Sequence, residues 1–352
     1  MNKRDYVVLH NQKIFIKDKK LDLEHKKLKK LSEVKGLESI NNLETLSLYD
    51  NLLKTLPEWI SKLDSLKTVL LIKNVLTDLP DSFGSLKNLE ELCLLNNKLN
   101  KIPKCIGKLQ SLKLLDLGGN KISENFGTLR TLHTLNTLSL ASCDLSNMPK
   151  SIQNLNGLEQ LHLGGNNLTN IPSFINKLKS LQILDLSGND FKTLPETITT
   201  LPLLKILYIN FSHLVKIPES IGNLRSLEEL YLINNLLTNL PESIGFLSSL
   251  KWLWLSNNYL NSLPDTIGNL ESLKILAIQH NSLTSLPESI GNLKSLRELD
   301  VSFNQLKTLP ESILELESLE LLGLLRNPLF FNQDFKTQSI IKSLKEKNVI
   351  IF

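Results

Sequence analysis

Two tryptophans in one short segment are the residues of this chain best suited to binding chemistry. In SLKWLWLSNNYLNSLP, residues 249–264, Trp252 and Trp254 stand on either side of Leu253, and the whole chain has only three tryptophans. An indole combines a large apolar surface with one N–H donor, and tryptophan is enriched among the residues that dominate interface energies. Whether these two side chains are available to a partner depends on the element that carries them.

Motifs for catalysis or metal binding are missing from the sequence. It has no GxxxxGK(S/T) phosphate loop, no HExxH or GxSxG motif and no EF-hand calcium loop. Its three cysteines, Cys93, Cys105 and Cys143, show neither CxxC nor Cys/His ligand spacing, so they indicate neither a disulfide framework nor a zinc site. We therefore expect a protein that is not an enzyme and that needs no cofactor and no metal.

Composition and charge are those of an ordinary soluble protein with a large core, 41% hydrophobic and 22% charged. A length of 352 residues favours two domains or a repeat array. The net charge of +4 is concentrated at the start, where residues 1–35 contain eleven Lys or Arg and five Asp or Glu. We interpret this basic segment as a solvated end of the fold; the alternative is attraction of an acidic partner or nucleic acid.

The first residues, MNKRDYVVLHNQKIF, carry charge but not the apolar segment of a secretory signal peptide. No window approaches the 18 consecutive apolar residues of a transmembrane helix. We therefore expect no cleavable leader and no membrane insertion, and a protein that is cytoplasmic or exported by a leaderless route.

An internal repeat determines the architecture. Asparagines recur at intervals of 23 or 46 residues, at Asn51, Asn74, Asn97, Asn120, Asn166, Asn189, Asn235, Asn258, Asn281, Asn304 and Asn327. Cys143 and Ser212, which are small and able to form hydrogen bonds, fill the two missing steps. Around each position the frame reads LxxLxLxxNxL, as in LRELDVSFNQL at 296–306; thirteen frames follow one another without insertion or deletion, after a degenerate one at 21–31.

Each 23-residue unit combines two kinds of structure. The LxLxx half alternates with period 2, which predicts a short strand with its leucines turned inward. The other half, as in LPESIGNLKSL at 286–296, starts with a proline and is short enough for a 3₁₀ or one-turn helix. Stacked units cover one another's leucines and form a parallel sheet on the concave side. The repeated asparagines are expected to bind backbone groups inside the turns, a structural role.

The frame LxxLxLxxNxLxxLPxxIxxLxxL resembles the short class of leucine-rich repeat found in bacterial leucine-rich repeat proteins and in Ras-group scaffolds. The resemblance covers residues 21–329 and implies an α/β solenoid of about 13–14 repeats. Such a solenoid is a right-handed superhelix with a concave parallel β-sheet and convex 3₁₀ or short-helix limbs. Phe126, which stands where other repeats have proline, departs from the pattern. The family implies little about function, because the same array serves many partners.

Three segments are expected along the chain. Residues 1–19 form an N-terminal cap with short strands of its own, residues 20–329 the repeat array, and residues 330–352 a C-terminal cap. The last segment, RNPLFFNQDFKTQSIIKSLKEKNVIIF, resembles the closing segment of the bacterial members, a helix followed by an edge strand. Caps are required because a terminal repeat exposes its core face.

Side chains that flank the inward leucines of each strand point to the concave surface. Trp252 and Trp254 therefore lie outside the core. The outward positions of repeats 8–11 form an apolar and aromatic patch of Ile206, Tyr208, Phe211, Tyr231, Ile233, Trp252, Trp254 and Ile275. A weaker second patch near the N-terminal end contains Tyr49, Leu70, Ile72, Leu95 and Leu114.

The patch on repeats 8–11 predicts the function. Exposed aromatic surface of this extent marks a partner site, so we expect a protein or peptide to bind there. Scattered carboxylates suit a basic or amphipathic partner, and the absence of a basic track argues against nucleic acid. The alternative is a structural role, in which the aromatic side chains stabilise the sheet or mediate weak self-association.

Overall fold

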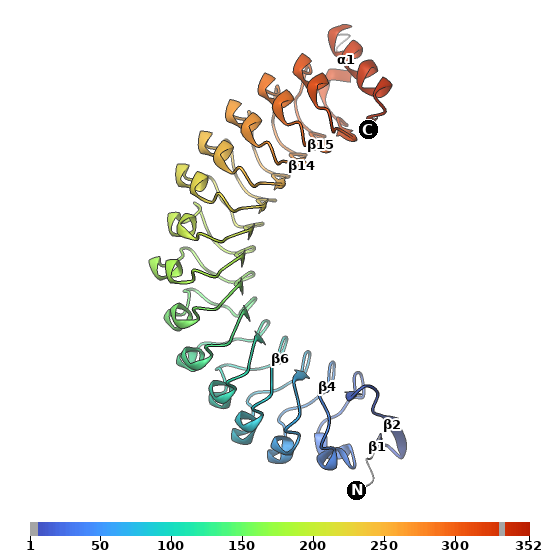
Figure 1. Ribbon diagram of the computed structural model, residues 1–352, viewed down its shortest axis with the longest axis vertical. Coiled ribbons are helices and arrows are strands. Elements are labelled where there is room, and N and C mark those ends of the chain that lie inside the picture. The colour runs from blue at the N-terminus through green and yellow to red at the C-terminus, as the bar shows by residue number, and fades with distance from the viewer. Residues whose placement is uncertain (1–5, 331–334) are drawn as a thin grey trace. The chain divides into compact units, whose positions relative to one another are not determined.

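The computed structural model describes residues 6–330 and 335–352 and divides the chain into two compact units. The first unit runs to Asn167 and includes Lys177–Leu181. The second contains Leu168–Asn176 and Gln182–Phe352. Within each unit the repeats are stacked side by side, with the strands along one side and the helical turns along the other (Figure 1).

Strands of the first unit are three residues long and pair in parallel, each with the next along the chain. They are β3 (Lys20–Asp22), β4 (Thr45–Ser47), β5 (Thr68–Leu70), β6 (Glu91–Cys93), β7 (Leu114–Asp116), β8 (Thr137–Ser139) and β9 (Gln160–His162). Before them, β1 (Tyr6–Leu9) and β2 (Gln12–Phe15) form an antiparallel hairpin.

The second unit repeats this arrangement, again with parallel pairing between successive strands. Its strands are β10 (Ile183–Asp185), β11 (Ile206–Tyr208), β12 (Glu229–Tyr231), β13 (Trp252–Trp254), β14 (Ile275–Ala277), β15 (Glu298–Asp300), β16 (Leu321–Gly323) and β17 (Ile350–Ile351). The register aligns equivalent positions, so that Leu230 pairs with Leu253 and Leu253 with Leu276.

Short 3₁₀ helices form the opposite side of each repeat. In the first unit they are η1 (Leu31–Glu33), η2 (Leu37–Ser39), η3 (Glu58–Lys62), η4 (Asp81–Ser85), η5 (Lys104–Lys108), η6 (Phe126–Thr131) and η7 (Lys150–Asn154). η8 (Ser173–Lys177) falls where the chain changes unit, and the second unit continues with η9 (Glu196–Thr200), η10 (Glu219–Asn223), η11 (Glu242–Phe246), η12 (Asp265–Asn269), η13 (Glu288–Asn292), η14 (Glu311–Glu315) and η15 (Pro328–Phe330). Most follow a proline, whose fixed φ directs the chain into the turn.

Inward leucines of successive repeats form the core of each unit. The central residue of every strand from β3 to β16 is fully buried, and so is the apolar residue two positions further on in most repeats. The solenoid predicted from the repeat, with parallel strands and 3₁₀ turns, is thereby confirmed.

Asparagine side chains connect neighbouring repeats, as expected. Asn258 Nδ2 donates to the carbonyl oxygens of Leu232 and Leu255, both at 2.9 Å, and its Oδ1 accepts the Leu237 N–H at 3.1 Å. Ser212 and Cys143 take part in the same pattern with single donors: Cys143 Sγ lies 3.4 Å from the Leu117 carbonyl oxygen. Burial raises the pKa of the Cys143 thiol to about 11, so the group stays protonated and able to donate.

The ends of the chain carry the elements expected of caps. The β1–β2 hairpin stands at the start, and α1 (Phe335–Glu346) with β17 stands at the finish, where Leu344 and Ile340 are buried. Residues 1–5 and 331–334 of the two expected caps lie outside the described residues. The division into caps and array at residues 19 and 330 stays a prediction.

Replacement of proline by Phe126 changes one 3₁₀ helix without moving the strands. η6 has six residues where most others have five, and it follows Asn125 in the left-handed region, with φ 62°. The neighbouring strands keep their register, since Leu115 still pairs with Leu138. The irregularity is confined to the helical side.

Candidate functional site

Both tryptophans of β13 lie on the outer face of the sheet. Trp252 and Trp254 are half-buried, while Leu253 between them is fully buried. This confirms the orientation inferred from strand alternation. The other face of the same strands is occupied by the leucine core, so that this outward surface, here called the strand face, is the part of the sheet open to a partner.

Three aromatic rings from successive strands form a stack on the strand face. The ring centroids of Tyr208 and Tyr231 are 4.5 Å apart with planes inclined by 23°, and those of Tyr231 and Trp254 are 6.0 Å apart with planes inclined by 10°. The parallel register brings these residues together, because it sets Tyr208 beside Tyr231 and Tyr231 beside Trp254. Tyr208, Tyr231 and Trp254 are called the aromatic stack below.

A carboxylate holds the middle ring of the stack. The Tyr231 hydroxyl donates to Glu229 Oε2 at 2.7 Å. Burial, followed by this hydrogen bond and the negative charge of Glu229, raises the pKa of Tyr231 well above its ordinary value. The phenol therefore remains a neutral donor at any physiological pH, and Tyr231 is restrained in one orientation.

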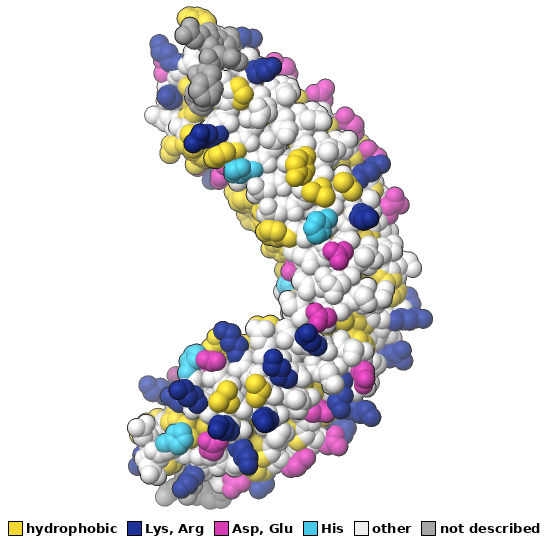
Figure 2. Space-filling model, turned by 180° about the vertical axis from the view of Figure 1, so that it is seen from behind, with side chains coloured by type: hydrophobic (Ala, Val, Ile, Leu, Met, Phe, Trp, Pro, Cys, Tyr) yellow, Lys and Arg dark blue, Asp and Glu magenta, His cyan; other side chains and the backbone are white. Residues whose placement is uncertain are grey.

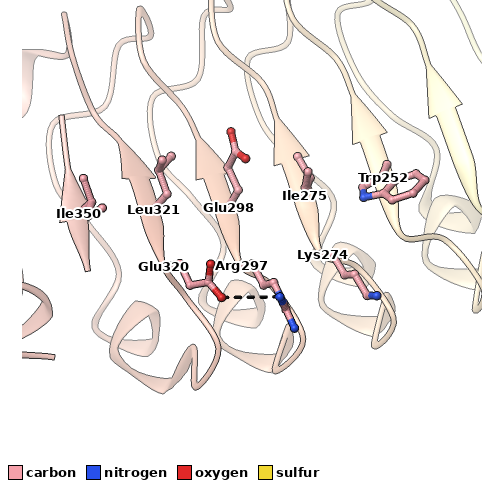
Figure 3. A pocket seen from close by; sticks show the side chains of 8 residues that line it. All are labelled: Trp252, Lys274, Ile275, Arg297, Glu298, Glu320, Leu321 and Ile350. Atoms are coloured by element: carbon pink, nitrogen blue, oxygen red, sulfur yellow. Dashed lines mark ion pairs between the residues drawn. The ribbon is translucent and has the colours of Figure 1, made fainter. Parts of the chain in front are cut away.

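A cavity of about 330 Å³ opens beside the stack, where the strands β13–β17 begin. It is lined by Trp252, Lys274, Ile275, Arg297, Glu298, Glu320, Leu321 and Ile350, shown in Figure 3. Arg297 Nη1 pairs with Glu320 Oε1 at 3.7 Å along the lower rim in that view. We call this space the Trp252 cavity.

Residues of the predicted main patch thus fall into different places. Tyr208, Tyr231 and Trp254 form the stack, and Trp252 and Ile275 line the cavity. Ile206 and Ile233 are half-buried on the same face, beside the stack. Phe211 instead lies in the turn that follows β11, in the left-handed region at φ 53°, and is 61% exposed.

Charge on the strand face of the second unit is uniformly negative. The outward positions of β10–β17 hold Asp185, Glu229, Glu298 and Asp300 and no Lys or Arg. Asp185 and Asp300 each accept a backbone N–H two residues ahead, at 2.9 and 3.0 Å, and Glu229 accepts the Tyr231 hydroxyl. For Glu298 the described residues provide neither a hydrogen-bond donor nor an ion-pair partner.

The second predicted patch lies on the first unit and is partly engaged by its own neighbours. Tyr49 meets His25 edge to face at 5.1 Å, and Lys73 Nζ lies 5.3 Å from the centre of the Tyr49 ring. Leu95 extends over Gly118, where a Cβ would meet Leu95 Cδ1 at 2.9 Å. Leu70, Ile72 and Leu114 are half-buried. As a partner site this second patch stays a prediction.

Sequence reasoning counted Glu298 among the carboxylates of the concave face but missed Leu321 and Ile350, which with Glu298 form the far wall of the Trp252 cavity. Glu298 and Leu321 continue the same outward position that carries Trp252 and Ile275, so the repeat frame contains a signal for them. Ile350 belongs to β17, outside the 23-residue frame, and only its pairing with Leu321 brings it to the cavity. It is 65% exposed.

A further group of apolar side chains, also missed, lies in the turns after the strands of the second unit. Leu236, Tyr259 and His280 contribute to a cavity of about 390 Å³, and His280 stacks on Phe303 with ring centroids 4.2 Å apart. Hydrophobic side chains and histidines are visible on this unit in Figure 2. Their signal in the sequence is the pair of positions on either side of each repeated asparagine. Leu236 and Tyr259 follow one, whereas His280 and Phe303 precede one and adopt positive φ.

Neither a metal site nor a membrane span is evident in the part of the chain that the structure describes. No three His, Cys, Asp or Glu side chains there are grouped to hold an ion. None of the described helices has the length and apolar character needed to cross a bilayer.

The comparisons with known proteins agree with this fold. A family model for the leucine-rich repeat region matches residues 19–147, 131–242 and 238–346. A leucine-rich repeat protein of Leptospira interrogans is 33% identical, with a TM-score of 0.82 over 94% of this chain and 95% of that one. An internalin of Listeria monocytogenes is 25% identical, with a TM-score of 0.72 over 86% of each chain.

Receptors of plants are also similar. The Arabidopsis receptor kinase HAESA, solved with a peptide hormone and a co-receptor, is 28% identical with a TM-score of 0.56, over 88% of this chain and 62% of that one. No curated protein matches the sequence. The family model and the Leptospira protein together cover nearly the whole chain, which therefore belongs to the leucine-rich repeat proteins.

Proposed function

We propose that this chain is a non-enzymatic binding module whose strand face in the second unit binds a protein or peptide. The observation that carries the proposal is the aromatic stack, half-exposed on a sheet whose other face is already filled by the core. Aromatic rings held in fixed orientation lose little conformational entropy on binding and provide large contact areas. Glu229 fixes the middle ring in this way.

Similar solved structures support a peptide as the partner. HAESA, which shares the fold, was solved with a peptide hormone bound. The absence of Lys and Arg from the outward positions of β10–β17 makes a nucleic acid a poor ligand, because phosphate binding depends on basic side chains. A partner here contacts rings and carboxylates.

Selection from a random peptide library displayed on phage tests the proposal directly. Peptides selected on the wild-type protein are expected to lose at least about 30-fold in affinity for Trp252→Ala, equivalent to roughly 2 kcal/mol. Trp59→Ala is the matched control, because Trp59 lies in the 3₁₀ helix η3 of the first unit and not on a strand. Binding that survives the loss of both Trp252 and Trp254 would rule out this face.

Self-association through the same surface is the second candidate. It is favoured by the stack and by Ile350, which leaves the end of the second unit apolar and exposed on strand β17. Light scattering across a dilution series separates the two. Self-association would be established if the mass of the wild-type protein falls with dilution and the Trp252→Ala protein has the monomer mass at every concentration.

A further inference from the structure

We propose that the Trp252 cavity receives a lysine or arginine side chain of the bound partner, with Glu298 as its counter-ion. The inference rests on the proposed function and specifies the chemistry of the partner. It starts from Glu298, the one carboxylate of the strand face in the second unit for which the described residues supply no donor.

The surroundings of Glu298 are apolar on both sides. Parallel pairing places Ile275 on one side of it and Leu321 on the other. The side chain is half-buried, so its carboxylate is only partly hydrated. A partly buried carboxylate is stabilised strongly by a positive charge placed next to it. A partner without a positive charge would remove water from the carboxylate and give nothing in return, which would be costly.

The cations closest in sequence do not satisfy this carboxylate. Arg297 is paired with Glu320 at 3.7 Å. Figure 3 shows Arg297 and Lys274 directed toward the lower rim of the cavity, whereas the Glu298 carboxylate points in the opposite direction. The lower rim thus carries Lys274 and the Arg297–Glu320 ion pair, and the Glu298 carboxylate, for which the described residues supply no partner, points away from it.

The remaining walls match the two parts of a long basic side chain. Ile275, Leu321 and Ile350 offer apolar surface for an aliphatic stem, and lysine and arginine bury such stems while their charged ends seek polar groups. Trp252 supplies an indole, the aromatic group that attracts cations best. A volume of about 330 Å³ is at the lower end for ligand sites and suits one side chain better than a folded element.

The rest of the face supports a cationic ligand. Asp185, Glu229 and Asp300 add negative charge at the outward positions of neighbouring strands, with no basic side chain among them. An acidic ligand would approach this surface against its field, whereas a basic segment is attracted. Apolar and aromatic residues of the same segment would lie on the aromatic stack.

A double-mutant cycle tests the inference. Peptides selected from the phage library are expected to share an Arg or Lys, and its replacement by Gln should weaken binding to the wild-type protein at least tenfold. In Glu298→Gln protein the same replacement should change affinity less than twofold, because the counter-ion is gone. The matched control, Glu271→Gln, alters an exposed glutamate beyond η12 and should leave the tenfold effect intact.

The indole N–H resonance of Trp252 in a ¹⁵N spectrum locates the binding, with Trp59 as the internal reference. Three results would overturn the inference. The selected peptides could lack a basic residue, or the effects on affinity of the peptide replacement and of Glu298→Gln could be additive. The third is that only peptides with leucine-like or acidic side chains shift the Trp252 resonance. The proposed function stands in all three cases as long as binding depends on Trp252. Failure to select any peptide would overturn both.

Discussion

Single asparagine side chains join most repeats to the one before them. Asn258 is buried and satisfies three backbone groups, the carbonyl oxygens of Leu232 and Leu255 and the N–H of Leu237. Buried backbone groups left without partners are costly. The amide ladder is therefore a stability feature, distinct from the residues of the strand face.

Replacing Asn258 by alanine should lower the free energy of unfolding by about 1–3 kcal/mol, because the buried Leu237 N–H loses its acceptor. The carbonyl oxygens of Leu232 and Leu255 each lose one donor but keep the amides of Asn235 and Asn281, both at 3.0 Å. The midpoint of urea unfolding, followed by circular dichroism, measures the change. Asn269→Ala is the control, because Asn269 is exposed at the end of η12, and it should shift stability by no more than about 0.5 kcal/mol. Equal effects of the two substitutions would contradict the structural role of the ladder.

Neighbouring 3₁₀ helices approach so closely that their glycines have no room for a side chain. A Cβ on Gly268 of η12 would lie 2.4 Å from the carbonyl oxygen of Ser289 and 2.8 Å from its Cβ, in the next repeat. Gly245 and Gly291 are enclosed in the same manner. Gly127, in the irregular η6, has no atom within 4 Å of the corresponding position.

Gly268→Ala should therefore destabilise the protein by about 2–3 kcal/mol, because backbone on the neighbouring helix has to shift. Gly127→Ala should leave stability unchanged or raise it by up to about 1 kcal/mol, since alanine restricts the unfolded chain and meets no obstacle. Both are measured by urea unfolding. A Gly127→Ala loss as large as that of Gly268→Ala would show that close approach is not the cause.

Charged side chains also connect neighbouring repeats, and one such link predicts a pH dependence. Glu44 lies between Lys19 and Lys67, with Lys67 Nζ at 2.9 Å. Hydrogen bonds from Lys19 and then Lys67 lower the pKa of Glu44 to about 2, from 4.5. A carboxyl group with a depressed folded-state pKa contributes stability above its unfolded pKa and loses it as the pH falls through the folded value.

Wild-type protein should accordingly be more stable than Glu44→Gln near pH 5, and the difference should disappear as the pH falls from about 4.5 to about 2. Thermal unfolding at a series of pH values follows it. Glu38→Gln should show no such trend, because no ion pair to Glu38 occurs among the described residues. A difference that persists at pH 2 would mean that Glu44 acts through packing.

Stability of the whole molecule is built from contacts between adjacent repeats, so its ends need protection. At the C-terminal end, β17 pairs with β16 and the Phe352 carbonyl oxygen accepts the Leu324 N–H at 2.7 Å. Helix α1 covers the last turns with buried Ile340 and Leu344, and the Thr337 hydroxyl oxygen accepts the Leu309 N–H at 3.3 Å. These contacts agree with the role of a cap.

Leu344→Asp should detach α1, because the substitution buries an unpaired charge in place of an apolar contact. The exposed end is expected to associate with other copies, which size-exclusion chromatography with light scattering would detect as a concentration-dependent mass. Ser339→Asp, on the exposed side of the same helix, should stay at the wild-type mass. An unaltered mass for Leu344→Asp would argue against a capping role for α1.

From the sequence alone it was possible to predict the repeat, the strand and turn in each unit, the buried asparagines and the outward direction of Trp252 and Trp254. These follow from local regularities, because alternation within a strand sets which side a residue faces and the 23-residue period brings equivalent positions together. Only the tertiary structure decided which outward side chains meet. Four features depend on rotamers and on pairing beyond the repeat frame. They are the ring orientation in the stack, the hydrogen bond from Tyr231 to Glu229, the lack of a donor to Glu298 among the described residues, and the position of Ile350 at the Trp252 cavity. Periodicity carries no information on these, since it specifies a direction from the backbone but not the contacts made at the end of a side chain.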